Sequence, residues 1–315
     1  MPRLTLPRAL VLASLALPAA LRAQSGGAVH EATSLLGEPL ERPTPTGSAL
    51  ARMEAQLAAA RRAWKHTPAN ADSIIWYGRR TAYLGRFNDA IAIYTEGIRQ
   101  HPRDARLYRH RGHRYLTVRQ IEPAIRDFET AADLVRGTRD EVEPDGQPNA
   151  RNIPVSTLQS NIFYHLGLAH YLRGDFPKAL AAWQEDAATH VNADMRVATS
   201  HWLYMTLRRM GRDAEAADVL RPITRDMDII ENGAYHRLLL LYKGELQESD
   251  LLRDGPGASL EDVTVAYGVG NWHLYNGRAA RADTIFRRIL AARSQWASFG
   301  YLSAEAEVAR AGKAR

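Results

Sequence analysis

Histidine pairs are the residues of this chain whose spacing could support chemistry, because imidazole binds metals and transfers protons near neutral pH. His110 and His113 are three positions apart and would share one face of a helix, but the sequence offers no third ligand near them. His165 and His170 are five apart, which separates their directions on a helix. We therefore predict no catalytic residues, no metal site and no cofactor.

A glycine motif and the absence of cysteine narrow the chemistry further. Residues 268–273 read Gly-Val-Gly-Asn-Trp-His, which lacks the third glycine of a dinucleotide-binding loop and falls within a predicted helix. Without cysteine, the chain can form no disulfide, no thiolate metal site and no lipid attachment through a thiol. An enzyme or a small-molecule carrier is accordingly the third of three hypotheses for this protein, and we predict that it is not an enzyme.

Three stretches of the sequence repeat one order of small and aromatic residues. Gly78 and Gly112 occupy equivalent positions, which gives a period of 34 residues. Small residues stand where two helices would approach closely, and a large residue would fill the gap to the next unit. Since no single hairpin can bury its apolar face, the pattern predicts stacked helical hairpins. The equivalent residues are Gly78, Ala90 and Tyr94; Gly112, Ala124 and Phe128; and Gly167, Ala179 and Trp183.

The period and these residues resemble the tetratricopeptide repeat (TPR) over about residues 50–311. The resemblance implies an all-α fold, a TPR α-solenoid, in which about five to six helical hairpins form a right-handed superhelix with N- and C-terminal capping helices. TPR proteins are adaptors that hold peptides or partner proteins, so the resemblance implies binding without naming the partner.

A weaker resemblance, to NlpI-type periplasmic TPR adaptor lipoproteins, lies in the second half of the chain. It rests on residues 201–204, on the short hairpin at 235–252 and on a closing unit with Tyr267, Gly270 and Gly277. The chain departs from that group because it lacks the cysteine that carries the lipid.

Residues 1–23 have the pattern of a secretory signal peptide. Arg3 and Arg8 stand without an acidic residue, an apolar run follows, and small residues mark a cleavage site. We expect export to the periplasm or the extracellular space, with a mature chain that is soluble and has no membrane span unless the signal is retained as an anchor. Cleavage would lower the net charge from +6 to +3, which disfavours a nucleic-acid partner.

The rest of the chain divides by composition. Glycine and proline predict a flexible tether at 24–47, an alanine-rich stretch predicts an N-terminal capping helix at 48–70, and the TPR-type solenoid spans 71–311. An acidic, proline-containing insertion at 137–156 breaks the repeat. The terminal helix, at about 297–311, is predicted to have a polar face.

Fixed positions on the first helix of each TPR hairpin would line a concave groove. On this chain they predict a cationic lip followed by an aromatic middle. Arginine offers a fork of donors for carboxylates and tyrosine offers rigid contact area, which favours an acidic protein or extended peptide as partner. The predicted binding residues are Arg79, Tyr83, Arg106, Arg109, His113, Tyr164, Tyr171, His201 and Arg208.

The insertion has two possible roles. It is either a solvated connector or a cover that folds over the arginines and occupies them. The residues that would do so are Asp140, Glu141, Glu143 and Asp145.

The favoured function is therefore an exported, non-enzymatic TPR scaffold that binds a protein or extended peptide in its concave groove. The alternative is a structural subunit of a larger envelope or extracellular complex, held by its convex side and end caps. A homodimer formed through an apolar hairpin or the terminal helix is compatible with both.

Overall fold

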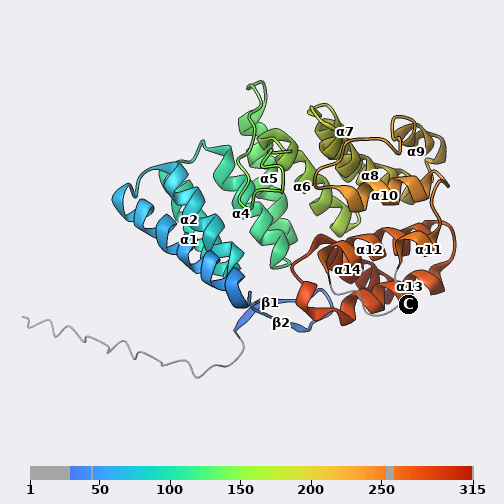
Figure 1. Cartoon of the computed structure of the whole chain (residues 1–315), viewed down its shortest axis with the longest axis horizontal. Coiled ribbons are helices and arrows are strands. Elements are labelled where there is room, and N and C mark those ends of the chain that lie inside the picture. Colours follow the sequence, from blue (N-terminus) through green and yellow to red (C-terminus); the bar gives the residue numbers. More distant parts are fainter. Residues whose placement is uncertain (1–28, 44, 253–258, 314–315) are drawn as a thin grey trace, which may run out of the picture.

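The computed structural model describes residues 29–43, 45–252 and 259–313, in which a short β-hairpin precedes fourteen α-helices (Figure 1). The predicted signal peptide lies outside the described residues, as do the first residues of the predicted tether. The strands are β1 (His30–Thr33) and β2 (Pro39–Glu41). The helices are α1 (Gly47–His66), α2 (Ala71–Tyr83), α3 (Phe87–Gln100), α4 (Ala105–Thr117), α5 (Ile121–Val135), α6 (Leu158–Arg173), α7 (Phe176–Ala187), α8 (Ala193–Arg209), α9 (Asp213–Leu220), α10 (Gly233–Tyr242), α11 (Glu248–Leu251), α12 (Leu260–Tyr275), α13 (Ala279–Ala291) and α14 (Phe299–Lys313).

Successive helices pair as hairpins and the hairpins stack, so the chain is a TPR-type α-solenoid. The repeated glycines explain the close approach of the paired helices. A Cβ atom on Gly112 would lie 2.9 Å from the ring of Phe128, and one on Gly167 would lie 2.7 Å from the ring of Trp183. The aromatic residue thus packs on the glycine of its own hairpin as well as toward the next unit.

The turns within the hairpins require a residue with a left-handed backbone. Gly85, Gly174, Gly211 and Gly277 fill this place with φ between +71° and +88°. Arg119 fills it in the second hairpin, 34 residues after Gly85, with φ at +65°. A side chain in this region costs about 1–2 kcal/mol that glycine would avoid, so a specific contact of Arg119 must offset the strain.

Residues 30–41 form an antiparallel hairpin, which corrects the prediction of a flexible tether throughout 24–47. The buried carboxylate of Glu31 accepts hydrogen bonds from the backbone N–H groups of Phe87 (3.1 Å) and Asn88 (3.3 Å) at the start of α3. It therefore caps a helix that is more than fifty residues away in sequence. Composition alone missed this element because such short strands depend on tertiary contacts.

The hairpin also contacts the other end of the chain. Trp296 Nε1 donates to the carbonyl oxygen of Glu41 (2.7 Å), and Arg293 donates to that of Pro39 (2.8 Å). The two strands consequently lie between the ends of α1 and α2 and the last helices of the stack (Figure 1).

The terminal helix α14 is buried, which corrects the prediction of a polar-faced cap. Every residue from Gly300 to Glu307 is buried, and the helix packs against α6, α12 and α13. Glu305 lies 2.9 Å from Arg119 Nε, and Glu307 lies 2.7 Å from Arg209 Nη1. The acids of α14 therefore neutralise arginines inside the protein, and the pair with Glu305 accounts for an arginine at a glycine position.

No helix in the described part of the chain combines the length and the apolar character that a membrane span requires.

Candidate functional site

Four residues of α2 and α4 gather beneath the insertion, and we call them the arginine site: Arg79, Tyr83, Arg109 and Arg114. All four lie close enough to influence one another electrostatically. Three of them, Arg79, Tyr83 and Arg109, are predicted groove residues. Arg79 and Tyr83 are four positions apart on α2 and therefore project from the same side of that helix.

The insertion lies on the arginine site, which decides between its two possible roles. The Glu143 carboxylate lies 3.0 Å from Arg109 Nε, and Arg80 Nη1 donates to the carbonyl oxygen of Gly146 at 2.7 Å. A Cβ atom on Gly146 would overlap the hydroxyl of Tyr83, so a glycine is needed for this close approach.

The acidic residues of the insertion divide into two pairs. Glu143 and Asp145 face the arginines, since Arg79 acts electrostatically on Asp145. Burial nevertheless raises the pKa of Asp145. Asp140 instead accepts a hydrogen bond from the backbone N–H of Gln159 (3.0 Å), and Glu141 is exposed. Half of the predicted acidic cover therefore occupies the site.

The arginine site retains unpaired positive charge. Burial lowers the pKa of Arg109 and lowers that of Arg114 to about 10. Arg79 and Arg114 form no ion pair with any residue that the structure describes; their guanidinium groups lie 4.5 Å from the ring centre of Trp76 and 5.6 Å from that of Phe87. Such cations are costly to bury, so a further anion would stabilise the site.

Arg109 also has an unused donor. Its side chain is nearly buried, with 7% of the residue exposed. Although Nε lies 3.0 Å from Glu143, the two are not aligned for a hydrogen bond, and Nε has no other partner among the described residues. A buried donor without an acceptor favours a ligand oxygen at this position.

Three histidines lie next to the arginine site and are neutral at physiological pH. Burial lowers the pKa of His110, His113 and His165 well below the usual value, and the nearby arginines add to the effect. The ring centres of His113 and His165 are 4.6 Å apart, and Phe299 of α14 contacts both. The described residues contain no group of three potential ligands that could hold a metal ion.

Two of the predicted groove residues are fully buried. Tyr171 accepts a hydrogen bond from Asn271 of α12 (2.9 Å), and His201 stacks on Tyr235 of α10 (4.7 Å between ring centres). Burial lowers the pKa of His201 to about 3. Later helices cover both positions, so they pack the interior and present no surface to a partner.

The remaining predicted residues lie apart from the arginine site. Tyr164 accepts a hydrogen bond from Trp202 (2.7 Å) within the aromatic core. Arg106 pairs with Asp104 and with Asp72 (2.6 Å each), and Arg208 pairs with Asp213 (2.8 Å). The structure thus brings together Arg79, Tyr83 and Arg109, with His113 adjacent, and separates the other five. The sequence prediction omitted Arg114 because it is five positions after Arg109, a separation that gives the two side chains different directions on α4.

The sequence prediction also missed a buried carboxyl in α7. Asp186 is fully buried and accepts hydrogen bonds from the hydroxyls of Ser160 (2.7 Å) and Thr199 (2.6 Å). Burial raises its pKa to about 7. Ser160 has no imidazole partner among the described residues, whereas the hydroxyl of Thr199 bonds to Nε2 of His190 (2.8 Å). One feature of the sequence indicates that Asp186 is buried: it follows the buried Trp183 by three positions and so lies on the same face of α7.

Comparisons with known proteins give structural neighbours but no family. No protein-family model matches the chain, and no curated protein matches it. Among solved structures, the chain is similar to YrrB, a TPR protein with an unusual peptide-binding site (15% identity, TM-score 0.42, covering 74% of this chain and 92% of YrrB). It is also similar to MamA (14% identity, TM-score 0.42, covering 64% of this chain and 99% of MamA). A third similar structure is a TPR protein from Parabacteroides merdae (13% identity, TM-score 0.44, covering 76% of this chain and 87% of that protein).

The fold and the site define a class of protein: a TPR-type α-solenoid with a partly neutralised cationic site beneath an acidic insertion. The likeness to NlpI-type adaptors stays a prediction.

Proposed function

We propose that the protein is an exported, non-enzymatic scaffold whose arginine site binds an acidic, extended segment of a partner protein. One observation carries the proposal: the chain's own insertion lies on the site, with Glu143 beside Arg109 and the Gly146 carbonyl bonded to Arg80, the neighbour of Arg79 on α2. A carboxylate and a main-chain carbonyl are the groups that an extended acidic peptide would offer to these arginines. The partner segment would take the place of residues 143–146.

The insertion is then an internal competitor for this site. After residue 146, the insertion makes exposed polar contacts, including Asn149 with Glu231 (2.6 Å) and Arg151 with Asp228 (2.8 Å). Exposed pairs of this kind contribute little, so the contacts beyond residues 143–146 add little to the cost of displacing the insertion. A tethered segment nevertheless acts at an effective concentration of about millimolar, so the partner must outcompete it.

The test uses a fluorescent peptide with the sequence of residues 139–149 and the chain from residue 24 onward. The wild-type protein should bind the peptide weakly, because its own insertion occupies the site. The double variant Glu143→Gln/Asp145→Asn should bind it about tenfold more tightly, since the internal competitor loses both charges. Fluorescence anisotropy measures the affinities.

Charge reversal then locates the binding site. In the background of that double variant, Arg79→Glu should abolish binding, whereas reversal of the exposed Arg126 on α5 should not. Arg79 is only half-buried and has no ion pair in the described structure, so circular dichroism should show a folded variant. Equal binding by the Arg79 and Arg126 variants would overturn the assignment of the site.

Export is the second part of the proposal, and it is supported by the charge and apolar pattern of residues 1–23. Expression of the full chain should yield a periplasmic or extracellular product whose N-terminus, determined by mass spectrometry, lies near Gln24. A full-length product that stays in the cytoplasm would contradict this part and leave the binding proposal intact.

A further inference from the structure

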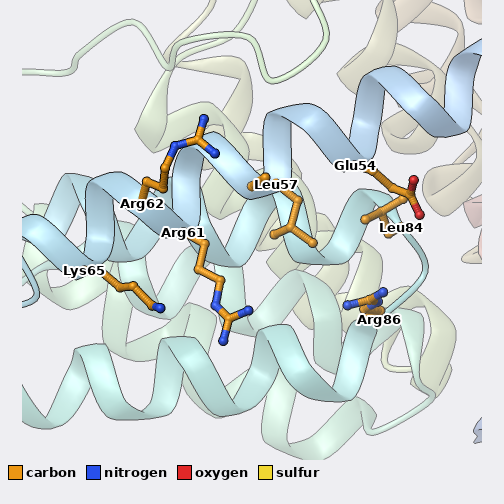
Figure 2. A pocket seen from close by; sticks show the side chains of 8 residues that line it. Glu54, Leu57, Arg61, Arg62, Lys65, Leu84 and Arg86 are labelled. Carbon is orange, nitrogen blue, oxygen red and sulfur yellow. The ribbon is translucent and has the colours of Figure 1, made fainter.

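A groove along α1 forms a second surface, which shares no residue with the arginine site. It has a volume of 410 Å³ and runs between α1 and the turn that joins α2 to α3 (Figure 2). Figure 2 shows Arg61 and Lys65 extending from α1 toward the side on which Arg86 lies. We call this surface the α1 groove; its apolar and cationic lining includes Leu57, Leu84, Arg61, Arg62, Lys65 and Arg86.

The residues that α1 contributes to this groove form one helical stripe. They stand at positions 54, 57, 58, 61, 62 and 65, a spacing of three and four that places them on a single face. Glu54 lies at the N-terminal end of the stripe, Leu57 follows, and the cations occupy the C-terminal end. The stripe therefore has a polarity that a helical partner could match.

Helix α1 is less covered than the helices that follow it. Although it has 20 residues, none of them is buried. Helix α3 packs between α2 and α4, whereas α1 packs on α2 and no described helix precedes it. Its stripe is thus an exposed helical face with apolar residues at its centre.

The cations of the α1 groove also lack counter-charges. None of the four forms an ion pair with any residue within the described ranges, whereas arginines elsewhere on the surface do, such as Arg99 with Glu96 and Arg106 with Asp72 (2.6 Å each). Basic residues in the last turn suit the negative end of the dipole of α1, but that interaction does not neutralise them. The carboxylates of a partner would neutralise these cations.

We propose that the α1 groove docks an acidic amphipathic helix of a partner protein. Leucine-like side chains of that helix would cover Leu57 and Leu84, and its carboxylates would pair with Arg61, Lys65 and Arg86. Side chains three and four positions apart on the partner would meet the same spacing on α1. This surface requires a helical ligand, unlike the arginine site, which takes an extended one.

The test uses a fluorescent, acetylated peptide of about 18 residues with leucines on one helical face and glutamates beside them. The double variant Arg61→Glu/Lys65→Glu of the chain should bind it about tenfold more weakly than the wild type, or worse. The matched control is Arg52→Glu/Arg126→Glu, which makes the same total charge change at two exposed positions off the stripe, and should change the affinity by less than about twofold.

Two further measurements separate an amphipathic helix from other anionic ligands. Leu57→Asp should also weaken binding, because the apolar face of the peptide contributes, and a peptide with lysine in place of glutamate should not bind. Unchanged affinity in Leu57→Asp or in Arg61→Glu/Lys65→Glu would overturn the proposal. It would equally be overturned if anionic phosphatidylglycerol vesicles bound through Arg61 and Lys65 while the acidic peptide did not.

Because α1 has no buried side chain, these variants should remain folded, which circular dichroism would check. The Arg79→Glu variant should retain full affinity for the helical peptide, so failure of either binding proposal would leave the other standing.

Discussion

Replacing Asp186 by asparagine should remove one loss of stability that this protein undergoes as the pH rises. Burial raises the pKa of this carboxyl to about 7 in the folded protein, against an ordinary value of 3.8. Between these two values the folded protein keeps a proton that the unfolded chain has lost, so its stability falls as the pH rises from about 4 to about 7 and levels off above. Asparagine cannot ionise, and the variant lacks this loss.

The magnitude follows from the size of the pKa shift. About three pH units correspond to roughly 4 kcal/mol when the shift is fully expressed. Between pH 5 and pH 8, ionisation of Asp186 should lower the free energy of unfolding by about 2.5 kcal/mol.

The groups around Asp186 support this attribution. Burial is the largest cause of the raised pKa of Asp186. The hydroxyls of Thr199 and Ser160 lower this pKa, and the charge of Asp140 raises it. His190 bonds to Thr199 at 2.8 Å, but burial lowers its pKa to about 4, so the imidazole is neutral across the measured range.

The assay is urea unfolding of the wild type and Asp186→Asn at pH 5, 6, 7 and 8, followed by circular dichroism and by tryptophan fluorescence. From pH 5 to pH 8, the free energy of unfolding of the variant should rise by about 2.5 kcal/mol relative to that of the wild type. As a control, Ser160→Ala removes a hydroxyl and keeps the carboxyl, so its pH dependence should persist. A difference between Asp186→Asn and the wild type that stays constant with pH would refute the reasoning.

Two predictions test how the stack is held together. Glu305→Gln leaves the charge of Arg119 buried without a counter-charge and should lower the free energy of unfolding by about 3–5 kcal/mol, measured in urea. The double variant Arg119→Gly/Glu305→Gln removes both buried charges and the left-handed strain, so it should cost less, and the reverse order would contradict the proposed compensation. Gly167→Val inserts a side chain against Trp183 and should cost about 1–3 kcal/mol in the same assay. Trp183→Leu should partly rescue Gly167→Val in a double-mutant cycle, whereas strictly additive effects would show that the two residues do not interact.

The repeat predicted the hairpins because their defining contacts are local. Gly78 and Tyr94, Gly112 and Phe128, and Gly167 and Trp183 are each 16 residues apart, so one turn and two short helices bring them together. Helix α1 was predicted to begin at residue 48 and lies at Gly47–His66, since an alanine-rich stretch and the following Thr67-Pro68 define its ends within the local sequence.

The candidate site was predicted only in part. Helical spacing put Arg79, Tyr83 and Arg109 on a common side, and the acidic composition of the insertion indicated that it could cover them. Spacing could not indicate that Tyr171 and His201 would be buried, because the helices that cover them, α12 and α10, come from a later part of the chain.

By itself, the sequence determined the α-helical hairpins, their stacking, their glycine turns and the break at 137–156, because each of these depends on short-range periodicity and backbone preference. Only the tertiary structure decided which surfaces stay open. The β-hairpin, the burial of α14 and the seating of Glu143 on Arg109 depend on contacts between distant segments, such as Arg119 with Glu305, 186 residues apart. A polar residue in such a contact has the same local pattern as one exposed to solvent, since only its distant partner distinguishes the two.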